Sequence, residues 1–275
     1  MTTTLITGIP RSGTTFVCAR LNLAPDCIAL AEPMAVPQHG DVARALDEIV
    51  DFVDVTRARL LTDGVAPSKT VDGVIADNFF EDLGADGELR RTRERVINVN
   101  FDKPLSTEFR LFIKHPAIFT ALAMPLSGRL PLYAIVRHPL AVLASWQTVD
   151  IPMRMGRSPA AEAFAPSLRA LLDSAAGPLD RQVELLRWHF QVYQGLPRER
   201  VLTYESLVQN PSESLAHLSG AMATFFPRGR VIDPRVRYRG VDFAALATAL
   251  FAIEADVEPF YPNFVASLHA HLAAA

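Results

Sequence analysis

Short apolar runs bounded by turn-forming residues are the strongest pattern along the chain, and they predict four strands. These runs cover residues 4–7, 111–113, 132–136 and 201–204. Apolar residues follow one another in them without polar alternation, which is typical of parallel strands covered on both faces. A shorter apolar run at residues 29–31 predicts a further short strand, which would end beside the loop that follows the first strand. We therefore expect a buried, mostly parallel sheet.

Segments with the helical spacing of apolar residues connect these strands. They cover residues 14–23, 42–61, 117–123, 141–148, 178–193 and 212–225. Strand–helix alternation over this length predicts an α/β fold with a central, mostly parallel sheet flanked by helices. Two segments, 63–108 and 150–176, fit the alternation less well, and the first is polar and irregular apart from 95–100. We expect both to leave the sheet as lids or substrate walls of a single domain spanning residues 1–275.

Composition and charge narrow the class of protein. The 275 residues are 49% hydrophobic and 21% charged, with a formal net charge of −3, as in an ordinary globular protein. This near balance of charge does not indicate the extended positive surface that binds nucleic acid, so any anion-binding site has to be local. Cys18 and Cys27 provide neither a disulfide framework nor a metal cluster. No apolar run reaches the ~18 residues of an integral membrane segment and no leader is visible, so we expect a cytoplasmic protein.

The loop after the first strand carries the first candidate chemistry. Residues 8–15 read Gly-Ile-Pro-Arg-Ser-Gly-Thr-Thr and lead into the first predicted helix. Gly8 permits a tight turn and Gly13 a close backbone approach, while the amides of a helix N-terminus attract anions. Four side chains add hydrogen-bond donors: Arg11, Ser12, Thr14 and Thr15. This combination predicts a phosphate-binding loop.

The loop differs in its charges from that of a nucleoside triphosphatase. Such an enzyme needs a lysine on the phosphates and an acidic strand end that holds Mg²⁺. Here Thr14 occupies the lysine position, and the strand ends carry Lys114-His115 and Arg137-His138 in place of acidic residues. We therefore expect side-chain cations to neutralise the phosphates, with no metal ion in the site.

Three segments of the chain resemble the sulfotransferases that use 3′-phosphoadenosine 5′-phosphosulfate (PAPS), in particular their bacterial branch. They are residues 8–15, residues 133–139 with Ser145 and Trp146, and residues 202–207 with Pro211. The first resembles the family's 5′-phosphosulfate loop, the second its 3′-phosphate segment, and the third a later Tyr-Glu-x-Leu strand end. The resemblance implies a P-loop three-layer fold, PAPS as donor and adenosine 3′,5′-bisphosphate as product. It also implies that Arg137 and Ser145 hold the 3′-phosphate.

The same resemblance implies roles for several cations. Arg11, where many family members carry lysine, would stabilise the leaving phosphate by its charge, because an arginine donates no proton at ordinary pH. Ser12, Gly13, Thr14 and Thr15 would bind the phosphosulfate beside it. Lys114 would neutralise the bridging oxygen or the sulfuryl group. Arg239, in the basic segment 235–240, is similar to a residue that clasps the nucleotide in some relatives.

Two residues are candidates for the base that activates the acceptor. Glu32 ends the short run at 29–31, and several branches of the family use a glutamate at about this distance after the loop. A carboxylate near a bound phosphosulfate is expected to have a raised pKa, which suits a general base. His115 follows Lys114, near where the family's eukaryotic cytosolic branch places its basic histidine. Glu32 is the first candidate and His115 the second.

The predicted function is therefore sulfuryl transfer from PAPS to a hydroxyl or amine of a small-molecule acceptor such as a sugar, lipid or natural product. Two alternatives remain open. One is a P-loop kinase or nucleoside triphosphatase, and the other is a nucleotide-binding module without turnover. The sequence predicts neither the identity of the acceptor nor the oligomeric state.

Overall fold

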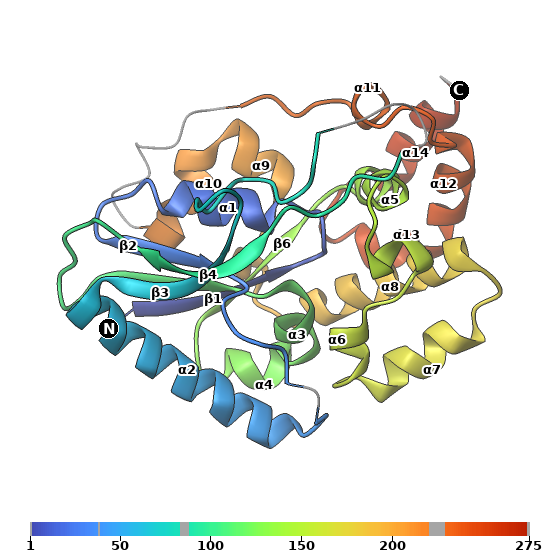
Figure 1. The fold of residues 1–275 in the computed structure, drawn as a ribbon. Helices are drawn as coiled ribbons and strands as arrows, with labels where there is room; N and C mark the ends of the chain where they lie inside the picture. Colours follow the sequence, from blue (N-terminus) through green and yellow to red (C-terminus); the bar gives the residue numbers. More distant parts are fainter. Residues whose placement is uncertain (1, 38, 83–87, 220–228, 274–275) are drawn as a thin grey trace.

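Five parallel strands form the central sheet of the computed structural model, which describes residues 2–37, 39–82, 88–219 and 229–273. Their order across the sheet is β2–β5–β1–β6–β7 (Figure 1). The strands are β1 (Thr2–Gly8), β2 (Cys27–Ala31), β5 (Arg110–Lys114), β6 (Leu132–Val136) and β7 (Val201–Thr203). Each coincides with a strand expected from the sequence, and the predicted α/β fold class is confirmed.

The register brings four strand ends together at one edge of the sheet. β5 and β6 pair with β1 on either side, and β2 pairs with the outer side of β5. Ala31 lies opposite Lys114 and Gly8 lies opposite Ile135, so the residues that follow these strands leave the sheet next to one another. After β1 the chain forms β2 at one edge of the sheet and then β5 between β2 and β1, before it adds β6 and β7 on the other side of β1. Open α/β sheets bind ligands at such a reversal.

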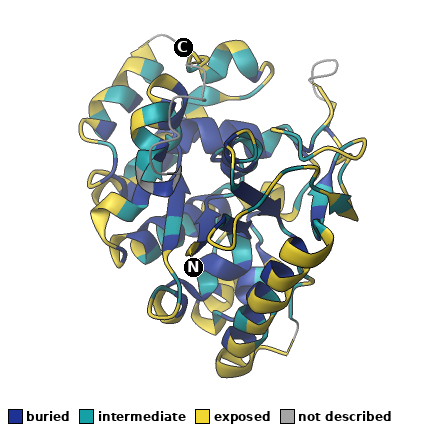
Figure 2. Ribbon diagram, turned by 90° about the vertical axis from the view of Figure 1, so that its left-hand side faces the viewer, coloured by how far each residue is buried: buried dark blue, intermediate teal, exposed yellow. Residues whose placement is uncertain are grey.

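Helices cover both faces of the sheet, which gives three layers (Figure 1). One face is covered by α1 (Thr14–Leu21), α9 (Tyr204–Gln209) and α10 (Pro211–Ser219). The other face is covered by α2 (Val42–Asp63), α3 (Pro116–Ala121), α4 (Ala123–Ser127) and α8 (Pro178–Gln194). Neighbouring strand residues alternate between the two cores: Ile135 packs in the first and Val136 in the second. Figure 2 shows the buried strands at the centre and exposed residues on the outer sides of the helices.

The predicted helices are present, with small shifts at their ends. α3, α5 (Pro139–Gln147) and α8 each have a proline in the first turn, where a missing N–H leaves no helical hydrogen bond unmade. The helix predicted at 117–123 appears as two short helices, α3 and α4, that meet at Leu122. The helix predicted at 212–225 corresponds to α10, and residues 220–225 lie outside the described residues.

The segment 63–108 contains a second sheet that the sequence only half predicted. β4 (Arg95–Asn100) coincides with the regular stretch expected there, but it pairs antiparallel with β3 (Val65–Thr70), which was expected to be irregular. That expectation was wrong because Pro67 and few apolar residues hide the strand pattern. The Ser68 hydroxyl accepts a hydrogen bond from the Ala31 amide at 3.0 Å, which ties β3 to the end of β2.

The segment 150–176 and the C-terminal part of the chain are helical. The first contains η1 (Pro152–Met155), α6 (Pro159–Glu162) and α7 (Pro166–Ser174). A short turn, η2 (Arg198–Arg200), precedes β7. The C-terminal part contains α11 (Pro234–Arg237), α12 (Phe243–Leu250), η4 (Phe251–Ile253), α13 (Glu254–Val257) and α14 (Phe264–Ala273). Within the described ranges, no helix has both the length and the apolar character that crossing a membrane requires.

Candidate functional site

The loop between β1 and α1 is held in place by its neighbours. The Ser12 hydroxyl donates to a backbone carbonyl of β6 at 2.7 Å, and the Trp146 indole donates to the Pro10 carbonyl at 2.9 Å. Gly13 has a φ of 95° and lies so close to the Tyr204 ring that a Cβ atom would collide with it. The amides that begin α1 are therefore presented at a fixed place on the carboxyl edge of the sheet.

Two charged residues at this edge adopt a backbone conformation with positive φ, which residues other than glycine rarely adopt. Five non-glycine residues of the described chain have a positive φ, and three of them are Asp or Asn, which tolerate it. The other two are Arg11, with a φ of 75°, and Glu32, with a φ of 45°. Residues held in this way collect at functional sites, where the surrounding structure fixes them. Backbone geometry therefore singles out two of the predicted site residues independently of their chemistry.

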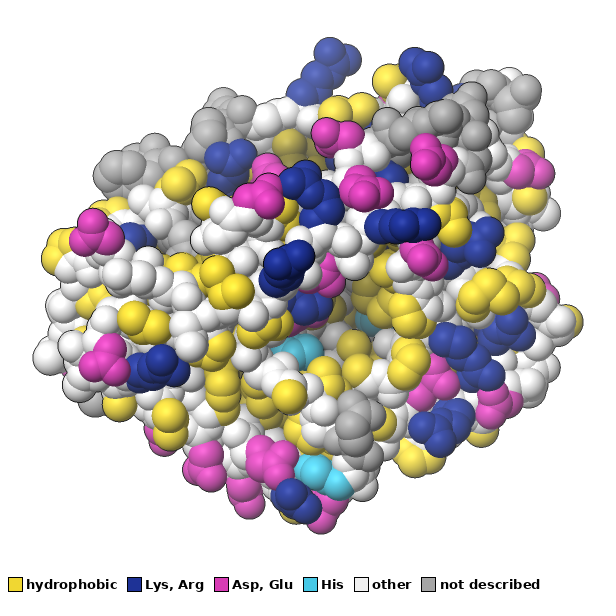
Figure 3. Space-filling view, in the orientation of Figure 1, with side chains coloured by type: hydrophobic (Ala, Val, Ile, Leu, Met, Phe, Trp, Pro, Cys, Tyr) yellow, Lys and Arg dark blue, Asp and Glu magenta, His cyan; other side chains and the backbone are white. Residues whose placement is uncertain are grey.

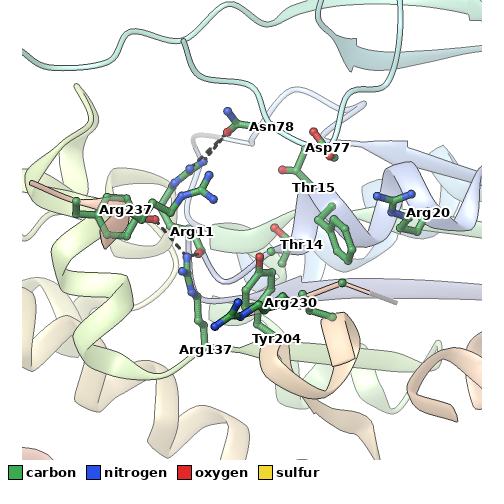
Figure 4. Close-up of a pocket in the computed structure, with 15 residues that line it drawn as sticks. Arg11, Thr14, Thr15, Arg20, Asp77, Asn78, Arg137, Tyr204, Arg230 and Arg237 are labelled. Carbon is green, nitrogen blue, oxygen red and sulfur yellow. Dashed lines mark hydrogen bonds between the residues drawn. The ribbon is translucent and has the colours of Figure 1, made fainter. Parts of the chain in front are cut away.

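A cavity of about 320 Å³ opens over the loop. Five arginines line it: Arg11, Arg20, Arg137, Arg230 and Arg237 (Figure 4). Gly13, Thr14 and Thr15 also line it, together with one acidic residue of the described chain, Asp77. A cavity with this excess of positive charge suits an anion that carries more than one negative group. We call it the arginine cavity.

Several donors in the arginine cavity have no acceptor within the described residues. The buried Nε atom is without a hydrogen-bond partner in Arg20, Arg137 and Arg237. Arg137 is only 7% exposed, and its Nη1 donates to the Arg11 carbonyl at 3.3 Å and to the Tyr238 hydroxyl at 3.4 Å. Buried donors without acceptors are costly, so a ligand that brings acceptor oxygens would gain from binding here.

Arg11 is half-buried and lies among aromatic and polar groups beside the loop. Its Nε donates to the Ser145 hydroxyl at 3.1 Å, and both terminal nitrogens donate to Asn78 Oδ1 at 3.4 Å. The guanidinium stacks on Phe80, 4.3 Å from the ring centroid. Burial, together with neighbouring arginine charges, lowers the pKa of Arg11 from 12.5 to about 10, so the side chain keeps its charge at neutral pH.

The Tyr204-Glu205 pair positions Arg137. The Tyr204 ring lies under the Arg137 guanidinium, with 4.7 Å between the guanidinium carbon and the ring centroid. Glu205 accepts hydrogen bonds from the His138 amide at 3.1 Å and from the Tyr261 hydroxyl at 2.8 Å. These contacts join α9 and the C-terminal helices to the end of β6. The segment 202–207 therefore orients the strand-end arginine.

Tyr238 is expected to titrate below the normal range of a phenol. Burial opposes its ionisation, but the charge of Arg137 and a hydrogen bond from Ser145 outweigh burial and lower the pKa from 10.0 to about 8. Because the pKa is lower in the folded chain, the phenolate contributes its full stabilisation, about 1–3 kcal/mol, above pH 10.0. This contribution is lost as the pH falls through about 8. Phenolate absorbance and unfolding of the wild type and Tyr238→Phe across this range measure both effects, and a phenol of normal pKa would contradict the prediction.

A second cavity, of about 290 Å³, shares Arg11, Thr14 and Thr15 with the arginine cavity. The segment 63–108 contributes Lys69, Phe79, Phe80, Thr92 and Glu94 to it, and the segment 150–176 contributes Ile151, Pro152, Met153 and Ala160. Glu32, Lys114 and His115 line it from the strand ends. The face drawn in Figure 3 is hollowed near its centre, and hydrophobic side chains border much of the hollow. The two cavities meet at the loop, and we call the second one the apolar cavity.

Glu32 is held by two lysines in the apolar cavity. Lys114 Nζ lies 2.6 Å from Glu32 Oε1, and Lys69 Nζ lies 2.8 Å from Oε2. Burial favours the neutral acid, but the two ammonium groups outweigh it and hold the pKa of Glu32 well below its usual range. This direction is the opposite of the rise expected from the sequence, because Lys114 and, to a smaller extent, Lys69 both pair directly with the carboxylate. Lys114, only 1% exposed, also donates to the Thr15 hydroxyl at 3.3 Å.

His115 presents a free lone pair. Its Nε2 lies 3.2 Å from the Met34 carbonyl, and since a carbonyl only accepts, Nε2 carries the proton and donates. Nδ1 is then the unprotonated nitrogen, and it is buried with no hydrogen-bond partner in the described part of the chain. Burial lowers the pKa of His115, although the charge of Glu32 opposes the shift. The imidazole is therefore neutral at pH 7 and able to accept a proton.

Most of the predicted site residues line the two cavities. Arg11, Gly13, Thr14, Thr15 and Arg137 line the arginine cavity, and Glu32, Lys114 and His115 line the apolar cavity. Ser12 and Ser145 are fully buried, each with a hydrogen bond inside the protein. Arg239 is exposed and lines neither cavity, whereas Arg237, two residues earlier, lines the arginine cavity.

The sequence did not predict several of the residues that line the two cavities. They are Arg20, Lys69, Asn78, Phe80, Glu94, Arg230, Arg237 and Tyr238. Arg237 and Tyr238 belong to the basic segment 235–240, so a signal for them existed. Lys69, Asn78, Phe80 and Glu94 belong to a segment without a motif, and only the tertiary fold brings them to the loop. Among the described residues, no three His, Cys, Asp or Glu side chains gather as a metal-ligand set.

Neither a protein-family model nor a curated protein sequence matches the chain. The solved structures that match it include two sulfotransferase domains that cover nearly its whole length. The sulfotransferase domain from the curacin biosynthetic pathway is 16% identical, with 99% of this chain and 97% of that chain covered and a TM-score of 0.37. The sulfotransferase domain from the Synechococcus PCC 7002 olefin synthase is 15% identical, with 99% and 94% covered and a TM-score of 0.35. At TM-scores this low the likeness decides nothing about function, which has to rest on the chain's own cavities.

Proposed function

We propose that this protein is a PAPS-dependent sulfotransferase that acts on a hydroxyl of a small-molecule acceptor. The observation that carries the proposal is the meeting of two unlike cavities at one loop, where they share Arg11, Thr14 and Thr15. Transfer of a group from an anionic donor to a less polar acceptor needs both ligands to end at the same place, because the reacting atoms must lie in line. The chain would act as one domain, with segments 63–108 and 150–176 walling the acceptor side.

The arginine cavity fits the phosphate groups of such a donor. Arg137 would hold the 3′-phosphate through its unpartnered Nε, beside Ser145 and the Tyr238 hydroxyl. The amides at the start of α1 and the Arg11 guanidinium would hold the 5′-phosphosulfate. Arg237 would clasp the nucleotide, which is the role expected of Arg239 from the sequence, because Arg237 lines the cavity. Adenosine 3′,5′-bisphosphate, the product, would keep these phosphate contacts.

The proposed reaction forms a bond between the acceptor oxygen and sulfur while the bond between sulfur and the leaving phosphate oxygen breaks. The acceptor gives its proton to a protein base, and the bisphosphate leaves. Arg11 and Lys114 would stabilise the negative charge that spreads over the sulfuryl and phosphate oxygens. The contact of Lys114 with the Thr15 hydroxyl keeps its ammonium beside the loop. Side-chain cations thus take the role that Mg²⁺ has in nucleoside triphosphatases.

We assign the base to His115. Both oxygens of Glu32 are paired with lysines, and a carboxylate whose pKa is held this low is a weak base. His115 lines the apolar cavity with a neutral ring and an unpartnered Nδ1. Glu32 would instead hold Lys114 and Lys69 in position. The ranking of the two candidates from the sequence is thereby reversed in this proposal.

The two base candidates are expected to respond differently to mutation. His115→Asn should lower kcat by about 100-fold or more, the usual contribution of a positioned base, with bisphosphate affinity nearly unchanged. Glu32→Gln should lower the free energy of unfolding by up to about 3 kcal/mol, because the buried Lys114 loses its charge partner. Steady-state kinetics, calorimetric titration with the bisphosphate and denaturant unfolding separate these effects. A larger loss of kcat in Glu32→Gln than in His115→Asn, at unchanged stability, would return the base to Glu32.

Thermal unfolding with different nucleotides tests the function itself. Adenosine 3′,5′-bisphosphate is expected to raise the Tm equally with and without Mg²⁺. At a hundredfold excess over its Kd it should stabilise the fold by about 2.7 kcal/mol, or roughly 5 °C. Stabilisation by ATP with Mg²⁺ alone would refute the proposal in favour of a kinase or nucleoside triphosphatase. Binding of the bisphosphate without sulfuryl transfer to any acceptor in a broad panel would favour a nucleotide-binding module.

A further inference from the structure

We propose that the apolar cavity selects an uncharged, predominantly apolar alcohol of about ten non-hydrogen atoms, an aliphatic alcohol or a phenol, and discriminates against sugars. The inference rests on the proposed sulfotransferase function and narrows its acceptor. It is carried by the cavity wall, the pairing of its charges, its unsatisfied acceptor atoms and its volume.

The wall of the cavity offers apolar contact. Phe79 and Phe80 line it from the segment between β3 and β4, and Ile151, Pro152 and Met153 line it from the start of η1. Val36 adds a further apolar side chain. A sugar presents hydroxyl groups around its whole ring, and against such a wall most of them would lose water without gaining a partner. A hydrocarbon chain or an aromatic ring gains from the same contact.

The charges of the cavity are paired with one another. Lys114 and Lys69 lie 2.6 and 2.8 Å from the two oxygens of Glu32, and Lys69 also lies 3.4 Å from Glu94 Oε1. These two cations and two anions leave no excess charge to attract an ionic acceptor. Arg11 also lines the arginine cavity, where the anionic groups of the donor would pair with it. An uncharged acceptor therefore fits best.

Two buried acceptor atoms belong to residues that line the cavity, and they indicate which polar group the ligand brings. Neither His115 Nδ1 nor Glu94 Oε2 has a hydrogen-bond partner among the described residues. Both His115 and Glu94 line the apolar cavity. Each atom can only accept, since the His115 proton lies on Nε2, so the ligand has to supply a donor. A hydroxyl group satisfies one of these two acceptors without bringing a charge.

The volume limits the size of the acceptor. The cavity measures about 290 Å³, and a water molecule in the liquid occupies about 30 Å³. The space therefore holds about ten water-sized groups, at the small end of the range for ligand sites. A long lipid or an oligosaccharide would have to extend out of the cavity.

Ligand-observed NMR titration of the full chain tests the acceptor class, first with adenosine 3′,5′-bisphosphate bound and then without it. The probes are n-octanol, p-propylphenol and glucose. We expect both apolar probes to bind at least tenfold more tightly than glucose. When PAPS is supplied, we expect the sulfuryl group to be transferred to the apolar probes in preference to glucose. Glucose binding as tightly as the apolar probes, or no binding of either apolar probe to a chain that binds the bisphosphate, would overturn the inference. Failure of the bisphosphate itself to bind would refute the proposed function instead, and the titration without it still tests the cavity.

Two methionines of η1 provide matched variants. Met153 lines the apolar cavity, whereas Met155, in the same short helix, is 47% exposed and does not line it. Met153→Gln should weaken n-octanol binding by about fivefold or more, and Met155→Gln should leave it unchanged, because both changes conserve volume and only one places an amide in the wall. Neither variant should alter bisphosphate affinity. Equal n-octanol affinity in the wild type and Met153→Gln would contradict binding at this wall.

Discussion

Replacing Arg137 with glutamine is expected to weaken the binding of adenosine 3′,5′-bisphosphate by about 30-fold or more. Arg137 is 7% exposed, lies over the Tyr204 ring and has a buried Nε without an acceptor among the described residues. Loss of a desolvated cation that pairs with a phosphate costs about 2–5 kcal/mol, which sets this scale. Isothermal titration calorimetry on both proteins gives the ratio of the two Kd values.

Arg239→Gln is the matched control for this prediction. It removes the same charge by the same substitution, but Arg239 is exposed and lines neither cavity. We expect its bisphosphate affinity to stay within about twofold of the wild type, because an exposed charge at a distance is screened by salt. Equal losses of bisphosphate affinity in the two variants would mean that nonspecific attraction to positive charge, and not the arginine cavity, binds the nucleotide. Unfolding of both variants without ligand shows whether Arg137→Gln acts through stability.

Replacing Arg11 with alanine is expected to lower kcat/KM for sulfuryl transfer by roughly 30- to 1,000-fold, or 2–4 kcal/mol, the scale for one preorganised donor that stabilises transition-state charge. Arg11 lines both cavities, so its guanidinium lies where the donor and acceptor meet. Its strained φ of 75° and its stacking on Phe80 hold it there. The measurement is the initial rate of transfer to n-octanol at low concentrations of PAPS.

Arg11→Lys is the conservative counterpart. It keeps the positive charge, which many members of the resembled family supply with lysine, but it loses the hydrogen bond to Ser145 and the fork toward Asn78. We expect it to recover most of the activity lost in Arg11→Ala. A wild-type rate in Arg11→Ala would refute the role assigned to this residue. Equal damage in both variants would show that the geometry of the guanidinium matters more than its charge.

The strands and the loop could be predicted because their signals are local. Residues 132–136 form an apolar run that is buried on both sides, and the register then brings its end beside Gly8. The loop from residue 8 to residue 15 is short, so its glycines and hydroxyls are neighbours in the sequence as well as in space. Arg137 and Lys114 could be predicted at the site because parallel strands on either side of β1 end at the same edge.

The walls of the cavities could not be predicted because no local pattern marks them. β3 lacks the apolar run of a buried strand, yet its Lys69 reaches Glu32 and, after Lys114, is the second ammonium group that lowers the pKa of Glu32. Tyr238 lies 101 residues beyond Arg137 in the chain, and its hydroxyl still contacts that arginine. Such contacts depend on the packing of whole segments against the sheet. The spacing of residues along the chain does not predict that packing.

The sequence by itself determined the fold class of this protein, the place of the loop at Gly8–Thr15 between the first strand and the first helix, and the cations at the two neighbouring strand ends. The local hydrophobic pattern and the spacing of residues along the chain are sufficient for those, because each follows from short-range sterics and from burial. The tertiary structure alone decided that two cavities meet at Arg11, that Glu32 is locked between two lysines, and that His115 is left with a free lone pair. Charge pairing and hydrogen bonding at a site depend on distances of a few ångströms between segments far apart in the chain, and only the folded packing sets those distances.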